Sequence, residues 1–176
     1  MKACGFDEPW AGIHIWGGSI ELHPELPWVH RLRLPDAFAV GPFSSLTAQE
    51  FNEIRQGEGV WYPPDLSPFA DEELVDQERS LVLRTGGAVV GWMIMERFDA
   101  RTILFKTMFV HARHQRMGRG LALAAEAGRR LTGDPAFSEW LLFVEGRNEV
   151  MVRFLRRHVS RPGVRKEVMW RTVKRL

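Results

Sequence analysis

The loop QRMGRG at residues 115–120 constrains the fold of this chain more than any other segment. Residues 102–110, which precede it, are mostly apolar and predict a strand, whereas residues 121–131 carry apolar side chains at the three- and four-residue spacing of a helix. A loop that joins a strand to the start of a helix exposes unpaired backbone N–H groups, and the helix dipole adds positive potential. Its two glycines let the main chain approach a ligand closely, and its two arginines add charge. The sequence therefore predicts a loop that binds phosphate.

The glycine spacing distinguishes this loop from two other phosphate-binding loops. It lacks the Gly-Lys-Ser/Thr ending of nucleotide hydrolases, and Leu123 stands where the dinucleotide fingerprint has its third glycine. The pattern instead resembles motif A of the GNAT superfamily of N-acetyltransferases, Gln/Arg-x-x-Gly-x-Gly/Ala. A loop that merely turns the chain is the alternative. The resemblance implies that acetyl-CoA is bound, as co-substrate, through Gln115, Arg116, Met117, Gly118, Arg119 and Gly120.

Periodicity predicts an α/β (α+β) fold with the element order of a GNAT core. From residue 37 the order is strand, two helices, three strands, helix, strand, helix, strand. The resemblance implies a mixed central sheet with helices on both faces, in which the parallel fourth and fifth core strands splay apart. The expected strands are 80–84, 88–96, 102–110, 140–144 and 164–173; the expected helices are 47–55, one starting at 67–74, 121–131 and one opened by Asn148.

The first 35 residues lie outside that core, so we expect two parts: an N-terminal extension, 1–35, and a GNAT domain, 36–176. Within the extension, residues 13–16 and 19–22 predict an extra β-hairpin around two glycines. Its tryptophans bring apolar surface that must be covered, so the extension is expected to pack on the core or extend its sheet. A subunit interface in a homodimer, or a lid over the acceptor pocket, is the alternative.

Composition excludes several classes of protein. The one cysteine, Cys4, rules out an internal disulfide, no Cys/His spacing suggests a metal site, and no apolar run reaches membrane length. Acids near the N-terminus do not fit a signal peptide, so we expect a cytoplasmic protein without a membrane partner.

The two halves of the chain differ in charge: residues 1–100 carry 7 Lys/Arg against 16 Asp/Glu, and residues 101–176 carry 17 against 6. The basic half contains the phosphate loop and would attract the anionic coenzyme, although pairing of the two halves is an alternative.

The resemblance also assigns residues along the rest of the coenzyme. The pantetheine arm would lie between strands 102–110 and 140–144, where main-chain groups around Val110 bind it. Asn148 would contact the coenzyme, although a helix cap is the alternative. The family's general acid is commonly a tyrosine at the place of Leu155, so this chain lacks the usual proton donor for the departing thiolate.

A general base is needed because an amine acceptor arrives as an ammonium ion. Strand 102–110 carries no acid, so we assign the catalytic base to Glu96 at the end of the preceding strand; Glu145 and His111 are the alternatives. Trp61 and Tyr62, in the loop between the first two helices, are expected to bind a small cationic or aromatic amine, unless Trp61 fills the core.

Together these features predict an acetyl-CoA-dependent N-acetyltransferase that transfers the acetyl group directly to a primary amine of a small molecule or peptide. The alternative is a GNAT-fold module that binds acyl-CoA with little catalysis. An arginine cluster at 153–166 would suit nucleic acid, but it lacks interleaved aromatic side chains, so no nucleic-acid partner is expected.

Overall fold

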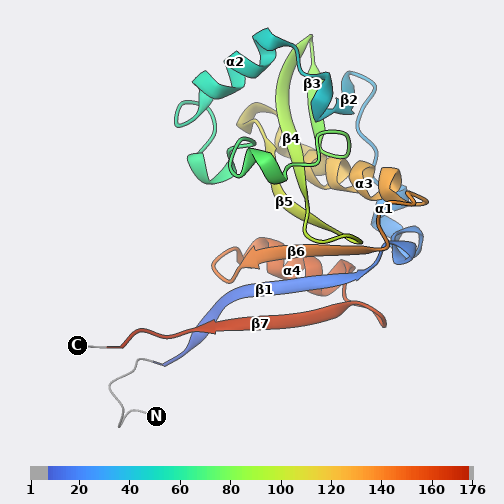
Figure 1. Cartoon of the computed structure of the whole chain (residues 1–176), viewed down its shortest axis with the longest axis vertical. Helices are drawn as coiled ribbons and strands as arrows, with labels where there is room; N and C mark the ends of the chain where they lie inside the picture. The colour runs from blue at the N-terminus through green and yellow to red at the C-terminus, as the bar shows by residue number, and fades with distance from the viewer. Residues whose placement is uncertain (1–7, 175–176) are drawn as a thin grey trace.

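A mixed sheet of order β2-β3-β4-β5-β6-β1-β7 runs through residues 8–174, the part of the chain that this computed structural model describes (Figure 1). Cys4 lies outside the described residues. The predicted fold class is confirmed, and the strands from residue 80 onward lie within a few residues of their predicted places. The strands are β1 Trp10–Ser19, β2 Phe38–Pro42, β3 Leu81–Thr85, β4 Ala88–Arg97, β5 Thr102–Val110, β6 Glu139–Glu145 and β7 Arg165–Arg171.

Four α-helices among the described residues cover the two faces of the sheet. They are α1 Pro27–Arg31, α2 Ala48–Gly57, α3 Arg119–Leu131 and α4 Glu149–His158. One apolar cluster packs under α3 and α4, and a second packs on the other face with Ile54 of α2. The predicted capping box begins α2: Thr47 accepts from the Glu50 amide, and the Glu50 carboxylate accepts from the Thr47 amide. Hydrogen bonds from Arg84 are the main reason that the pKa of Glu50 falls to about 2.

β5 and β6 run parallel, as predicted, but they pair over only part of their length. Residues 102–105 pair with residues 139–142, and the last pair is Phe105 with Leu142. Lys106 is an extra residue on β5, because Ile94 pairs with Thr107 while Met95 pairs with Phe105. Such a bulge bends its strand. Beyond it β5 continues to residue 110 without a partner on β6, and Figure 1 shows β6 turned away from β5.

The predicted N-terminal hairpin is wrong. β1 runs without a break through Gly17 and Gly18 and lies between β6 and β7, antiparallel to both. Neither glycine turns the chain. A Cβ on Gly17 would lie 3.0 Å from the carbonyl oxygen of Trp140, and one on Gly18 would lie 3.2 Å from the carbonyl oxygen of Gly163. The glycines therefore permit close approach of neighbouring backbone, and the extension supplies an inner strand of the sheet.

The second predicted helix is also wrong. The segment after α2 contains two single 3₁₀ turns, Pro64–Leu66 and Glu72–Leu74. Proline at position 68 removes a backbone donor, and Asp71 has a left-handed backbone with φ of 53°. A continuous helix is incompatible with both features. The segment therefore forms an irregular loop over the face of the sheet that carries α2.

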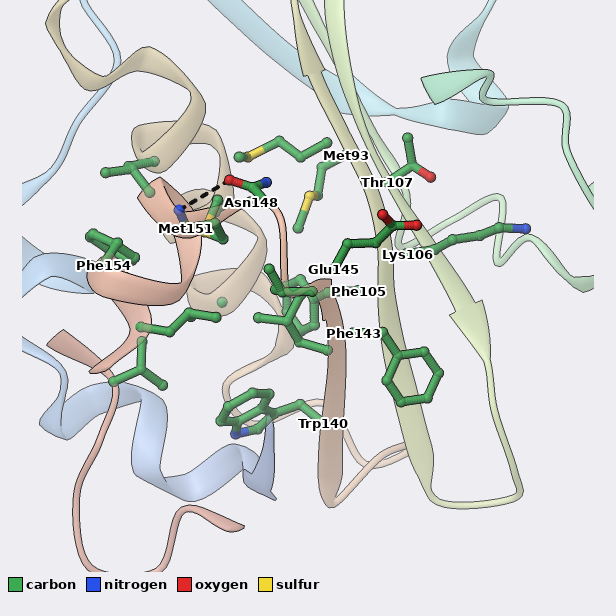
Figure 2. Close-up of a pocket in the computed structure, with 18 of the residues that line it drawn as sticks. Met93, Phe105, Lys106, Thr107, Trp140, Phe143, Glu145, Asn148, Met151 and Phe154 are labelled. Atoms are coloured by element: carbon green, nitrogen blue, oxygen red, sulfur yellow. Dashed lines mark hydrogen bonds between the residues drawn. The ribbon is translucent and has the colours of Figure 1, made fainter. Parts of the chain in front are cut away.

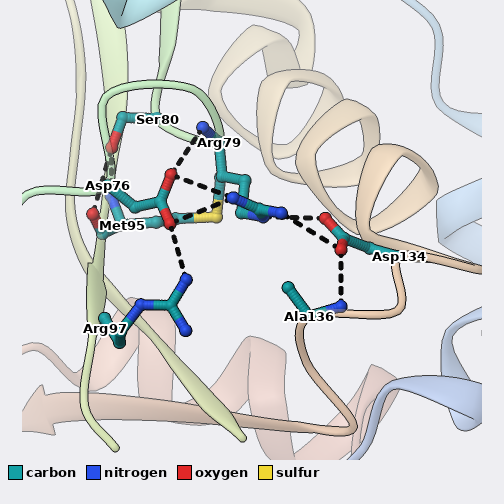
Figure 3. A network of polar contacts seen from close by, with 7 residues as sticks. All are labelled: Asp76, Arg79, Ser80, Met95, Arg97, Asp134 and Ala136. Atoms are coloured by element: carbon teal, nitrogen blue, oxygen red, sulfur yellow. Dashed lines mark hydrogen bonds and ion pairs between the residues drawn. The ribbon is translucent and has the colours of Figure 1, made fainter. Parts of the chain in front are cut away.

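An ion network joins this loop region to the turn after α3 (Figure 3). The Arg79 guanidinium donates from Nε to Asp134 at 2.7 Å and pairs with Asp76 at 3.3 Å, and Arg97 approaches Asp76 at 3.6 Å. Asp134 also accepts from the backbone amide of Ala136. The network thus ties β4 to the turn that leads into β6, near the end at which β5 and β6 are still paired.

Candidate active site

A cavity of about 550 Å³ opens where β5 and β6 part (Figure 2). Phe105 to Met108 of β5 form one wall, and Leu142 to Glu145 of β6 form the other. The cavity reaches both faces of the sheet, because the loop after α2 contributes Pro63, Asp65 and Leu66 while α3 and α4 contribute from the opposite side. A ligand can therefore enter from one face and meet a second ligand from the other.

The loop predicted to bind phosphate, residues 115–120, lies between β5 and α3, as expected, and continues into the first turn of α3. Met117 and Gly118 have left-handed backbones, with φ of 63° and 71°. Gly118 is the N-cap residue of α3, and no side chain caps the helix there. The amides of the first helical turn have no acceptors within the helix, so this loop presents free donors to an anion.

Gln115 anchors the loop. Its Nε2 donates to the carbonyl oxygen of Val110, the last residue of β5, at 2.9 Å. Gly120 lies against the same strand, since a Cβ there would lie 3.4 Å from Cε of Met108. These contacts set the start of α3 close to β5. The glutamine therefore positions the main chain of the loop, while Val110 is buried and does not line the cavity.

The two arginines of the loop differ in their surroundings. Arg119 lies over the Phe38 ring at 4.9 Å and donates from Nη1 to the carbonyl oxygen of His114 at 3.3 Å. Arg116 is exposed and forms no ion pair within residues 8–174, and Met117 is 90% exposed. Arg116 is thus the loop cation that is free to pair with a phosphate, whereas Arg119 also holds the loop to β2.

Asn148 caps a helix and also borders the cavity, and its contact with the coenzyme stays a prediction. Its side chain caps α4 by accepting from the Met151 amide at 3.2 Å, and the same residue lines the cavity (Figure 2). Residues 115–120 do not line this cavity, but Leu121, which follows them, does. The cavity therefore begins beside the phosphate loop and runs along the starts of α3 and α4.

Glu96 is buried and pairs with Lys106 on the face of the sheet that carries α2. Lys106 also pairs with Asp71, with 2.7 Å between Nζ and the carboxylate oxygen. Burial alone would lower the pKa of Lys106, but hydrogen bonds to Asp71 and Glu96 outweigh it and raise the pKa. Lys106 and Thr107 line the cavity, whereas Glu96 does not. The raised pKa keeps Lys106 protonated beside Glu96.

The two aromatic residues predicted to bind the acceptor do not line the main cavity. Tyr62 is buried and its hydroxyl donates to the Ile54 carbonyl at 3.0 Å, and burial is the main cause that raises its pKa. Trp61 packs against Trp92 and His111 and lines a second cavity of about 300 Å³. The residues of this loop that reach the main cavity are Pro63, Asp65 and Leu66, and Asp65 is the one acid among them.

Several cavity residues had no signal in the sequence pattern. His23, Leu26, Trp28 and Val29 line the cavity from the N-terminal extension, because α1 packs on α3. No spacing in the sequence relates them to the loop near residue 115. Leu155, at the place of the family's tyrosine, is buried and lines the cavity with an apolar side chain. The chain's one tyrosine, Tyr62, is used in packing.

Comparison with known proteins identifies the family to which this site and fold belong. Residues 44–159 match the sequence model of the acetyltransferase (GNAT) family. The match covers more than half of the chain, so the protein belongs to the GNAT family of acetyltransferases, and the resemblance inferred from the phosphate loop is confirmed. A search of curated proteins found no match.

Solved structures share this fold. A GCN5-related N-acetyltransferase from Sphaerobacter thermophilus is similar with a TM-score of 0.60 and 21% identity, over 98% of this chain and 53% of that one. Another GCN5-related N-acetyltransferase, from Kribbella flavida, has a TM-score of 0.56 and 14% identity, over 96% of this chain and 59% of that one. A tandem GNAT protein of the clavulanic acid biosynthesis pathway has a TM-score of 0.60 and 14% identity, over 98% of this chain and 55% of that one. This chain thus spans under two thirds of the length of these structures.

Proposed function

We propose that the protein transfers an acetyl group from acetyl-CoA to a primary amine of a small molecule or peptide. The observation that carries this proposal is a cavity between splayed parallel strands that begins beside an uncapped, glycine-rich helix start. The diphosphate of the coenzyme would bind at the loop, with Arg116 beside it. Residues 106–110 of β5 have no partner on β6. Their backbone N–H and C=O groups on that side are therefore available to the pantetheine amides, which would bind as an added strand does at a sheet edge.

The chemistry is a direct transfer across the sheet. The acceptor nitrogen attacks the thioester carbonyl, an N–C bond forms, the C–S bond breaks and CoA leaves as a thiolate. A backbone N–H of β5 near the bulge would stabilise the negative charge on the carbonyl oxygen. A water molecule would protonate the thiolate, since the usual tyrosine is replaced by Leu155. The acceptor would approach past Asp65, on the face that carries α2, with a carboxylate available for its ammonium group.

The test is a screen of primary amines with acetyl-CoA, in which released CoA thiol is detected. Thiol release that depends on the amine, with the acetylated amine identified by mass, supports transfer. Tight binding of CoA without turnover on any amine would instead support the alternative, a binding module. The observation that favours this alternative is that the chain's one tyrosine is buried away from the cavity.

No helix within residues 8–174 has the length and apolar character to cross a membrane.

Glu96→Gln is expected to lower kcat about a hundredfold, the scale of a general base contribution. Glu96 remains our proposed base, and the acceptor amine must displace Lys106 from the carboxylate for the proton to reach it. The pH dependence of kcat should lose its acidic limb in this variant. Glu145→Gln is the comparison, because Glu145 is an exposed acid on the other wall of the cavity. Unchanged turnover and an unchanged pH profile in Glu96→Gln would show that the base lies elsewhere.

Assembly as a homodimer also remains a prediction. β7 is an edge strand, and within the described chain its residues are all exposed. Met169 is 52% exposed and Trp170 is 63% exposed, so this edge carries the apolar surface that a second copy would cover.

A further inference from the structure

The cavity continues beyond the splayed strands as an arm between α3 and α4. Leu121, Ala124 and Gly128 line it from α3 at spacings of three and four residues, which places them on one face of the helix. On the other side, α4 contributes Met151 and Leu155 at a spacing of four residues. Val159, the residue that follows α4, lines the arm four residues further on. From Leu121 to Gly128 the helix rises about 10 Å, so the arm extends roughly that far from the coenzyme entrance.

The arm changes from polar to apolar along its length. Its opening carries Asn148, Lys106 and Glu145, which suit the polar part of a coenzyme. The far end is closed mainly by apolar side chains: Leu26, Trp28, Val29, Trp140, Phe154, Leu155 and Val159. Figure 2 shows Phe105, Trp140 and Phe154 around this part of the cavity.

The one titratable group at the far end is uncharged at neutral pH. His23 is buried, and its Nδ1 donates to the carbonyl oxygen of Gly128 across 3.3 Å. Burial lowers the pKa of His23 to about 4, although the bond to Gly128 acts in the opposite direction. The N-terminal extension therefore ends the arm with a neutral ring and mainly apolar side chains, which would not suit a charged ligand. The polar exceptions are the indole N–H groups of Trp28 and Trp140, which are buried and have no hydrogen-bond partner within residues 8–174.

Small residues keep the arm open. Ala124 has an intermediate exposure although it lies on the inner face of α3, because it borders the cavity. A Cβ on Gly128 would contact His23 at 3.6 Å and Val29 at 3.8 Å, so its absence leaves room at the far end. An acetyl group has a single methyl beyond its carbonyl and would leave this arm unfilled.

We propose that the arm holds the acyl chain of the donor, and that the protein accepts medium-chain acyl-CoA thioesters as well as acetyl-CoA. This inference rests on the proposed function, because the arm is continuous with the expected coenzyme site. The pantetheine would occupy the part of the cavity beside residues 106–110, so the acyl chain would lie farther in, among the apolar side chains at the far end. The reaction is unchanged: the acyl C–S bond breaks, an amide N–C bond forms, and the thiol leaves.

Binding of CoA, acetyl-CoA, butanoyl-CoA and octanoyl-CoA to the full chain, measured by titration calorimetry, tests the proposal. Burial of each methylene is worth about fourfold in affinity, so octanoyl-CoA should bind at least about a hundredfold tighter than acetyl-CoA. Ala124→Leu places extra carbon atoms in the arm and should reduce that ratio to within about threefold. Its affinity for CoA and acetyl-CoA should stay near that of the unmodified protein. Ala48→Leu, on the exposed start of α2, is the matched control and should keep the full preference.

Three outcomes would overturn the proposal. Equal affinities for acetyl-CoA and octanoyl-CoA would show that the arm does not hold the acyl chain. A preference for octanoyl-CoA that survives in Ala124→Leu would place the chain elsewhere. Binding of octylamine that Ala124→Leu abolishes, with no effect of acyl length, would assign the arm to the acceptor. Failure of all four coenzyme species to bind would instead reject the proposed function, so the two failures are distinguishable.

Discussion

Replacing Gly118 by aspartate is expected to raise the Kd for acetyl-CoA at least about a hundredfold, because a carboxylate would face the diphosphate at the start of α3. Gly118 is the N-cap residue and has a φ of 71°, with open space where a Cβ would be. Aspartate tolerates the left-handed region better than most residues, so the fold should persist. Calorimetric titration with acetyl-CoA measures the effect, and circular dichroism checks the fold.

Gly133→Asp is the matched control for this variant. Gly133 follows α3, has a φ of 82°, and also has open space at its Cβ position. The same substitution there adds the same charge and a similar backbone strain at the opposite end of the helix. Its Kd for acetyl-CoA should stay within about threefold of the unmodified protein. An equal loss of affinity in both variants, or no loss in Gly118→Asp, would contradict a specific phosphate site at the loop.

Deletion of residues 1–35 is expected to prevent the chain from folding. The deletion removes β1, which lies between β6 and β7, so β7 would lose its only partner among the described strands. It also removes the buried side chains of Trp16, Ile20, Leu26 and Val29. Each contributes about 1.5–3 kcal/mol by burial, and the total is comparable with the roughly 5–15 kcal/mol by which a domain is stable. Loss of the cooperative thermal transition, followed by circular dichroism, is the expected result.

Addition of a synthetic peptide covering residues 8–35 controls for damage caused by the deletion itself. If β1 is an inner strand, the peptide should restore part of the transition when it is mixed with the deleted chain. A deleted chain that melts cooperatively on its own would contradict this role for the extension. In that case the predicted division into an extension, 1–35, and a separate GNAT domain, 36–176, would be supported.

Local patterns predicted most of the elements around the proposed coenzyme site. The strand at residues 102–110 and the helix after the loop are set by apolar periodicity, and the Thr47 capping box begins α2 as expected. These features depend on residues that are close in sequence. The parallel pairing of β5 with β6 also followed from a local rule, because a short crossover helix joins the two strands.

Features that depend on distant contacts could not be predicted in this way. A glycine pair suggests a turn, yet Gly17 and Gly18 are needed because Trp140 and Gly163 approach them from other strands. Tyr62 lies in a loop sequence that suggested a binding site, but its hydroxyl is satisfied by the Ile54 carbonyl in the core. Likewise, nothing local shows that α1 would close the far end of the cavity. Such positions are fixed by tertiary packing, which periodicity does not report.

The proposed coenzyme site is tested most directly by following the backbone amide resonances by NMR while acetyl-CoA is added. We expect the largest shift changes on amides 116–120, with further changes at residues 106–110 and 143–148 along the splayed strands. Added inorganic diphosphate should move the loop amides but leave the strand amides in place. Saturating acetyl-CoA that leaves amides 116–120 unmoved, or shifts a different surface, would contradict the proposed coenzyme site.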